Sequence, residues 1–253
     1  MRFKGKYNFL LFKFMIKEIR PAIINGKKPS CDFCNPHLSP GGKHFLEYGP
    51  NGRLDLAPLI DTEHMLVLPD ILPVNPDGHA ILIPKAHILS LAQWDGFSEE
   101  TGKLIYQVEE KLKFPLTIFE HGGVSEIGNT HQSKVHAHMH LIANRQDFNI
   151  IELMKYFFKN KGIFWQEIAL TDSSPPRNLR HLFQGRGYIY VQQGRSALIA
   201  HENGTKFPSL VTQGLTSVIY SNRELNWKTI SKDSELAKLS IQRIVDIRKK
   251  CQL

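Results

Sequence analysis

The sequence predicts an α+β fold in which helices flank an antiparallel sheet. Short apolar runs alternate with polar residues in the strand period of two, and turn-rich segments join some of them as hairpins. Helical runs do not alternate regularly with strands, as they would in a doubly wound parallel sheet. We divide the 253 residues into a leader (1–30), a central domain (31–147) and a carboxy-terminal extension (148–253), which we expect to be a lid or an appended α+β subdomain.

The predicted elements follow one another along the whole chain. Strands are predicted at 63–68, 79–83, 116–120, 136–143, 163–170, 188–192 and 196–200. Helices are predicted at 88–94, from Ser98 to about residue 113, and at 150–159, 208–220 and 234–250. Glu99 and Glu100 in the first turn of the second helix, with Lys111 near its end, fit the preferences of the helix dipole. The segment 31–58 is rich in Gly, Pro, Asn and His, and we expect it to be ordered only if a cross-link such as a bound metal stabilises it.

The charge balance favours anionic partners. Lys and Arg number 32 against 24 Asp and Glu, which gives a net charge of +8. The apolar run 9–12 lies between lysines, and it is far shorter than the roughly 20 residues that a membrane span requires. Cysteine is sparse, so a reducing compartment is expected and the protein is predicted to be cytoplasmic, without a membrane span.

Three histidines occupy alternate positions of one apolar run. His136, His138 and His140 should line one face of a strand, with neighbouring rings roughly 7 Å apart. Imidazole titrates near neutral pH, so such a row suits nucleophilic or acid-base chemistry on a bound anion, or metal ligation. The alternative is a purely structural role, in which the strand has three buried, hydrogen-bonded histidines.

The run resembles the signature of the histidine triad (HIT) family, in which histidines alternate with apolar residues. Four motifs support the resemblance in the expected order: the segment 78–87, the turn 119–122, the pair Gln132 and Ser133, and the triad itself. The resemblance covers about residues 31–145 and implies a HIT-like antiparallel core. Pro208, Ser209 and Trp227 only faintly resemble the carboxy-terminal extension of longer members.

The resemblance implies a nucleotide-processing enzyme that acts at the α-phosphorus. His138 would attack to form a covalent nucleotidyl-histidine, and His140 would bind the phosphate and assist the leaving group. Gln132 and Ser133 would bind the phosphoryl group, and Glu120 and His121 would contact the nucleotide.

The family's transferases have Gln at the position of His140, which makes hydrolysis the prediction here. The expected substrates are dinucleoside polyphosphates or nucleoside phosphoramidates. A nucleotidyltransferase or phosphorylase that uses phosphate or a sugar phosphate is the first alternative, and a non-catalytic nucleotide sensor is the second.

Cys31 and Cys34 are separated by two residues, a spacing typical of a metal site or a redox pair. In a related uridylyltransferase class such a pair binds structural zinc together with the histidines that correspond to His87 and His136. The resemblance therefore implies one structural zinc, with His37 and His44 as rival ligands.

A small-molecule nucleotide is the expected partner. Nucleic acid is not expected, because DNA-end-processing relatives have a later zinc finger and this chain has only Cys251 in its second half. The family commonly dimerises, so a homodimer is an open alternative.

Overall fold

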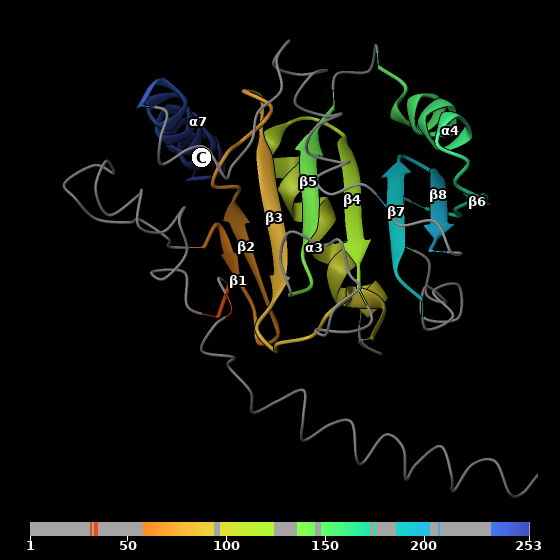
Figure 1. The fold of residues 1–253 in the computed structure, drawn as a ribbon. Helices are drawn as coiled ribbons and strands as arrows, with labels where there is room; N and C mark the ends of the chain where they lie inside the picture. The colour runs from red at the N-terminus through yellow and green to blue at the C-terminus, as the bar shows by residue number, and fades with distance from the viewer. Residues whose placement is uncertain are drawn as a thin grey trace, which may run out of the picture.

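The computed structural model describes residues 31, 33–34, 58–93, 97–123, 136–144, 148–172, 175, 186–202, 207 and 234–252. Their strands form one eight-stranded sheet, in the order β1-β2-β3-β5-β4-β7-β8-β6, and each strand pairs antiparallel with its neighbours (Figure 1). The strands are β1 (Ile60–Asp61), β2 (Met65–Pro69), β3 (His79–Pro84), β4 (Leu116–Gly122), β5 (Met139–Ala143), β6 (Trp165–Ala169), β7 (Tyr188–Gln193) and β8 (Ser196–His201). The predicted α+β class with an antiparallel core is confirmed.

Within the described residues, three α-helices accompany the sheet: α3 (Phe97–Leu112), α4 (Ile150–Asn160) and α7 (Ser234–Gln252). The capping groups follow the expected chemistry. Asn149 accepts a hydrogen bond from the backbone N–H of Glu152 at the start of α4, and Lys113 ends α3 in the left-handed region with φ of 63°. In place of the helix predicted at 88–94, the structure has a short 3-10 helix, Leu91–Gln93. The helix predicted at 208–220 and the leader lie outside the described residues.

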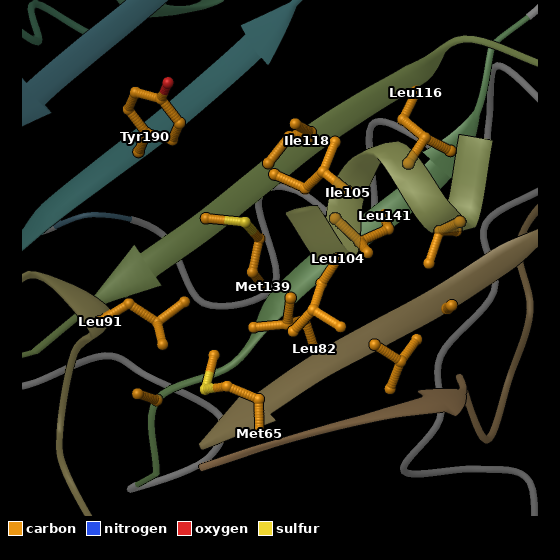
Figure 2. Packing of buried hydrophobic residues seen from close by; sticks show 14 of the residues in the cluster. Met65, Leu82, Leu91, Leu104, Ile105, Leu116, Ile118, Met139, Leu141 and Tyr190 are labelled. Atoms are coloured by element: carbon orange, nitrogen blue, oxygen red, sulfur yellow. The ribbon is translucent and has the colours of Figure 1, made fainter. Parts of the chain in front are cut away.

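Helices cover both faces of the sheet. On one face, α3 packs Leu104, Ile105 and Val108 against apolar residues of the central strands (Figure 2), and Figure 1 shows this helix behind β3, β5 and β4. On the other face, α4 packs Met154 and Phe158 with residues of β7 and β8. Because side chains of β5 alternate, Met139 and Leu141 lie on the α3 face, and His140 lies with Ile142 on the α4 face.

The described strands of the carboxy-terminal extension continue the sheet. β7 pairs with β4 over six residue pairs, and the predicted hairpin of β7 and β8 is confirmed. The sheet of the central domain and that of the extension therefore share one hydrogen-bonded ladder. The boundaries of the three predicted segments stay a prediction.

The helix α7 lies at the opposite side of Figure 1 from β7 and β8 and contacts α3 and β2. Its early residue Leu236 joins the apolar cluster on the α4 face, whereas Ile247 and Cys251 join the cluster on the α3 face. The helix therefore crosses the edge of the sheet, where it reaches the loop between β2 and β3. Among the described residues, no helix has both the length and the apolar character that crossing a membrane requires.

Candidate active site and metal cluster

The histidine row lies partly outside its predicted strand. β5 begins at Met139, so of the three histidines only His140 is in the sheet ladder. The prediction of a strand from 136 is wrong at this end. Local bonds replace the ladder there: the Ala137 N–H donates to the Ile88 carbonyl at 2.7 Å, and the side chains of His136 and His138 hydrogen-bond to backbone carbonyls. The rings of His138 and His140 are 5.1 Å apart, closer than the strand repeat predicts.

Cys31, Cys34, His87 and His136 converge on one point. The His136 Nδ1 atom lies 3.3 Å from Cys31 Sγ and 3.5 Å from Cys34 Sγ, and the Nδ1 atoms of His87 and His136 are 3.2 Å apart. In a tetrahedral zinc site, bond lengths of about 2.05 Å to nitrogen and 2.3 Å to sulfur separate two nitrogens by about 3.3 Å and a nitrogen from a sulfur by about 3.6 Å. The donor atoms and their spacing fit a Cys₂His₂ zinc site, and all four predicted ligands are brought together.

The hydrogen bonds of His136 suit it as a metal ligand. Its Nε2 atom is 2.9 Å from the Pro84 carbonyl, which can only accept, so Nε2 holds the proton and Nδ1 has the free lone pair. Burial lowers the pKa of His136 to about 4, which keeps the ring neutral at physiological pH. This bond also joins the end of β3 to the start of the histidine row.

His138 has the opposite tautomer. Its Nδ1 atom donates to the His136 carbonyl at 2.9 Å, so the lone pair is on Nε2. Burial, together with the neighbouring His140, lowers the pKa of His138 to about 3. His138 is 9% exposed, and its ring lies against the Phe33 ring at a centroid distance of 5.2 Å. The result is a neutral imidazole with one fixed nucleophilic nitrogen.

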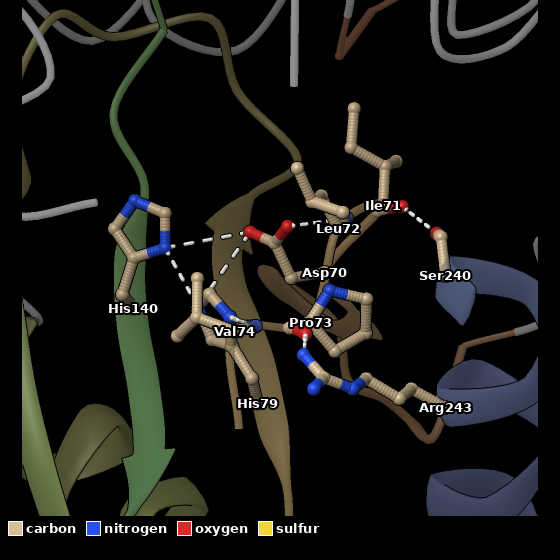
Figure 3. Close-up of polar contacts among 9 residues, drawn as sticks. All are labelled: Asp70, Ile71, Leu72, Pro73, Val74, His79, His140, Ser240 and Arg243. Atoms are coloured by element: carbon tan, nitrogen blue, oxygen red, sulfur yellow. Dashed lines mark hydrogen bonds and ion pairs between the residues drawn. The ribbon is translucent and has the colours of Figure 1, made fainter. Parts of the chain in front are cut away.

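His140 belongs to a second cluster, with Asp70 and His79 (Figure 3). The His140 Nδ1 atom is 3.0 Å from His79 Nε2 and 3.4 Å from Asp70 Oδ2. Asp70 Oδ1 accepts the Leu72 N–H at 2.7 Å. Burial would raise the pKa of the Asp70 carboxyl, but the positive charges that His79 and His140 carry when protonated outweigh burial and lower this pKa to about 2. The cluster therefore holds a carboxylate beside the third histidine of the row.

The sequence assigned no role to Asp70 or His79. His79 lies on β3 next to β5, where Ile81 is the register partner of His140, so the two histidines are diagonal neighbours on the same face. Burial lowers the pKa of His79 to about 4. A sequence pattern could have indicated this pair: Asp70 follows one predicted strand, His79 begins the next, and a hairpin brings the two ends together.

The structure gives Glu120 an interior position away from the row. Glu120 is the register partner of Met139 and lies on the α3 face, whereas His140 lies on the other face. Its carboxyl oxygens accept the Leu91 N–H at 2.7 Å and the Tyr188 hydroxyl at 2.6 Å, and no surface of the residue is exposed. His121, the next residue, is on the histidine face and packs its ring against Phe207 at 5.7 Å. Of this pair, His121 lies on the face of the row, and the predicted role of both residues stays a prediction.

Several predicted site residues lie outside the described residues. These are Gln132, Ser133, His37, His44, Pro208, Ser209 and Trp227. Their predicted roles stay predictions.

The histidine row lies in a part of the chain that is similar to a known protein family. The sequence model of the HIT domain matches residues 53–147. A search of curated protein sequences found no match. Among solved structures, the chain is similar to a Hit-like protein involved in cell-cycle regulation from Bartonella henselae, with 17% identity and a TM-score of 0.30 over 39% of this chain and 73% of that one.

It is also similar to a HIT family hydrolase from Clostridium thermocellum, with 19% identity and a TM-score of 0.31 over 48% of this chain and 96% of that one. A third similar structure is yeast Ap4A phosphorylase in complex with AMP, with 12% identity and a TM-score of 0.40 over 79% of this chain and 75% of that one. The match of residues 53–147, which include all three histidines of the row, identifies this chain as one with a HIT domain.

Proposed function

We propose that this protein is a nucleotide hydrolase that cleaves at the α-phosphorus through a covalent nucleotidyl-His138 intermediate. The observation that supports this most strongly is the bond between His138 Nδ1 and the His136 carbonyl, because it leaves the Nε2 lone pair free to attack. Dinucleoside polyphosphates and nucleoside phosphoramidates are the substrate classes.

The atoms balance for a dinucleoside polyphosphate. His138 Nε2 forms a bond to the α-phosphorus, and the bond from phosphorus to the bridging oxygen breaks with its electron pair leaving on the nucleotide product. His138 keeps its Nδ1 proton, so the intermediate is a cationic phosphoramidate whose charge lies beside the His136 carbonyl. Water then forms the new phosphorus–oxygen bond, the phosphorus–nitrogen electrons return to Nε2, and the water proton passes to solvent.

His140 supports this step from the adjacent ring position. Its side chain is 17% exposed, and its ring centroid is 5.1 Å from that of His138. A hydrogen bond from His140 to the bridging oxygen would stabilise the charge that develops as the leaving group departs. Gln132 and Ser133 are proposed to bind the phosphoryl oxygens.

We also propose that Cys31, Cys34, His87 and His136 hold one structural zinc. All four positions are protein ligands, so the site leaves no open position for substrate, which is typical of a structural rather than a catalytic zinc. When bound, the metal would connect Cys31 and Cys34 to His87, which follows β3, and to His136, which lies two positions before His138. It would thereby fix the backbone carbonyl that orients His138.

The experiment compares wild type, His138→Asn and His64→Asn on diadenosine tetraphosphate and on a fluorogenic adenosine phosphoramidate. His64 is a matched control, since its side chain is 53% exposed. We expect His138→Asn to lose at least about 10³-fold in kcat and the control to lose none. Wild-type turnover retained in His138→Asn contradicts the proposal. Parallel assays with orthophosphate and with a hexose phosphate separate hydrolysis from transfer, since a transferase would convert the added acceptor into a nucleotidyl product.

A further inference from the structure

The helix α7 donates hydrogen bonds to the loop that follows β2. Ser240 Oγ donates to the Ile71 carbonyl, and Arg243 Nη1 donates to the Pro73 carbonyl (Figure 3). Lys250 Nζ donates to the Asp77 carbonyl at 2.9 Å. These contacts join residues about 170 positions apart in the chain, and Ser240 is fully buried.

The loop is buried and depends on such donors. Leu72 and Val74 have no exposed surface, so the carbonyls between them and β2 need partners from elsewhere in the protein. At the far end, Asn75 donates from its side chain to the Ala143 carbonyl of β5. The loop is thus attached to α7 on one side and to β5 on the other.

The same loop determines where the protons of the histidine cluster lie. The Val74 backbone N–H can only donate, and it is 3.2 Å from His79 Nδ1, so neutral His79 has its proton on Nε2. His79 Nε2 in turn lies 3.0 Å from His140 Nδ1 and donates to it. Neutral His140 therefore accepts at Nδ1 and has its proton on Nε2, the opposite edge of the ring.

These bonds argue against a second metal in this cluster. A cation bound to His79 Nε2 would move the ring proton to Nδ1, where it would face the Val74 N–H, and two donors would then oppose each other. The hydrogen bonds instead indicate that this cluster fixes which nitrogen of each histidine ring carries the proton. Asp70, within the same loop, accepts the Leu72 N–H and keeps its carboxylate beside both rings.

We propose that Ser240 and Arg243 are positioning residues: by fixing the loop 70–75 they hold His79, and through it they make His140 present an Nε2 proton to the leaving group. This inference rests on the proposed function for its consequence in catalysis. The placement of the ring protons itself is independent of activity.

The kinetic test compares two AMP esters with similar size and different leaving groups, para-nitrophenyl and phenyl. A hydrogen bond to the leaving oxygen matters most when that oxygen leaves poorly. We expect Arg243→Ala to lower kcat for the phenyl ester by about tenfold more than for the para-nitrophenyl ester, with partial recovery in Arg243→Lys. Ser240→Ala should change kcat in the same direction by less. Gln242→Ala and Lys238→Ala, on the exposed side of α7, should leave both rates unchanged.

The structural test records histidine tautomers by long-range proton–nitrogen NMR on the full-length, metal-loaded protein. We expect wild-type His79 and His140 to be protonated at Nε2, and Arg243→Ala to give mixed tautomers at both. The inference is overturned by an Nδ1-protonated His140 in wild type, by unchanged tautomers in Arg243→Ala, or by equal rate losses for the two esters. Absence of wild-type turnover on both esters contradicts the proposed function. In that case the tautomers measured by NMR still test whether Ser240 and Arg243 position His79 and His140.

Discussion

Buried Glu120 should make the stability of this protein depend on pH. Burial raises the pKa of Glu120 from an ordinary 4.5 to about 7, although the hydrogen bonds from Tyr188 and Leu91 oppose the rise. The folded protein therefore keeps this proton up to about pH 7, whereas the unfolded chain releases it near pH 4.5. Stability is lost as pH rises through this interval, and the difference of about 2.5 pH units corresponds to about 3 kcal/mol at 1.36 kcal/mol per unit.

The substitution Glu120→Gln removes the titration at nearly constant volume. The new amide can accept only one of the two hydrogen bonds that the carboxyl group accepts, which costs about 1 kcal/mol at low pH. We therefore expect the variant to have about the same stability as wild type at pH 5, where the unfolded wild-type chain has already released most of this proton, and to be about 2 kcal/mol more stable at pH 8.

Urea unfolding followed by circular dichroism at pH 5, 6, 7 and 8 measures this difference. Wild type and variant share the cysteine and histidine cluster, so its own pH dependence cancels in the comparison. Glu110→Gln, on the exposed side of α3, is the matched control. The reasoning is refuted if the difference in free energy of unfolding between wild type and variant stays constant within about 0.5 kcal/mol from pH 5 to 8.

Three further predictions concern the metal cluster, the sheet and a helix cap. Cys34→Ser should bind well under one equivalent of zinc by elemental analysis and lower the Tm by about 6 °C or more, and retention of stoichiometric zinc would contradict the assigned ligands. Gly122→Ala should destabilise by about 3 kcal/mol, because a Cβ there would overlap the Tyr188 ring of the paired strand, and an unchanged urea midpoint would argue against this packing. Asn149→Ala should cost about 1 kcal/mol by removing the cap on the Glu152 N–H, with Asn149→Ser retaining most of the stability in the same assay.

Short-range patterns predicted the architecture, whereas the metal ligands followed from the cysteine spacing together with the family resemblance. Alternating apolar residues and hairpin turns predicted most strands, and α4 and α7 were found close to their predicted bounds. The cysteine pair and the resemblance together predicted four ligands that the fold does bring together.

The true start of β5 and the contacts of α7 depend on interactions that no local sequence pattern encodes. The alternation of histidines predicted a longer strand, but the His136 side chain bonds the Pro84 carbonyl, and His138 bonds the backbone of His136, in place of a ladder. By contrast, the strand period of two already indicates that Glu120 and His121, as consecutive residues of one strand, lie on opposite faces of the sheet. The α7 contacts link residues about 170 positions apart and required the fold.

The covalent adduct is the measurement that tests the central claim most directly. Wild-type protein mixed with diadenosine tetraphosphate, quenched in base within milliseconds and digested, is analysed by mass spectrometry for an adenylylated peptide. The account predicts adenylyl on His138 Nε2, formed at least as fast as turnover and absent from His138→Asn. Turnover by wild type with no adduct on His138, or with the adenylyl group on another residue, would contradict it.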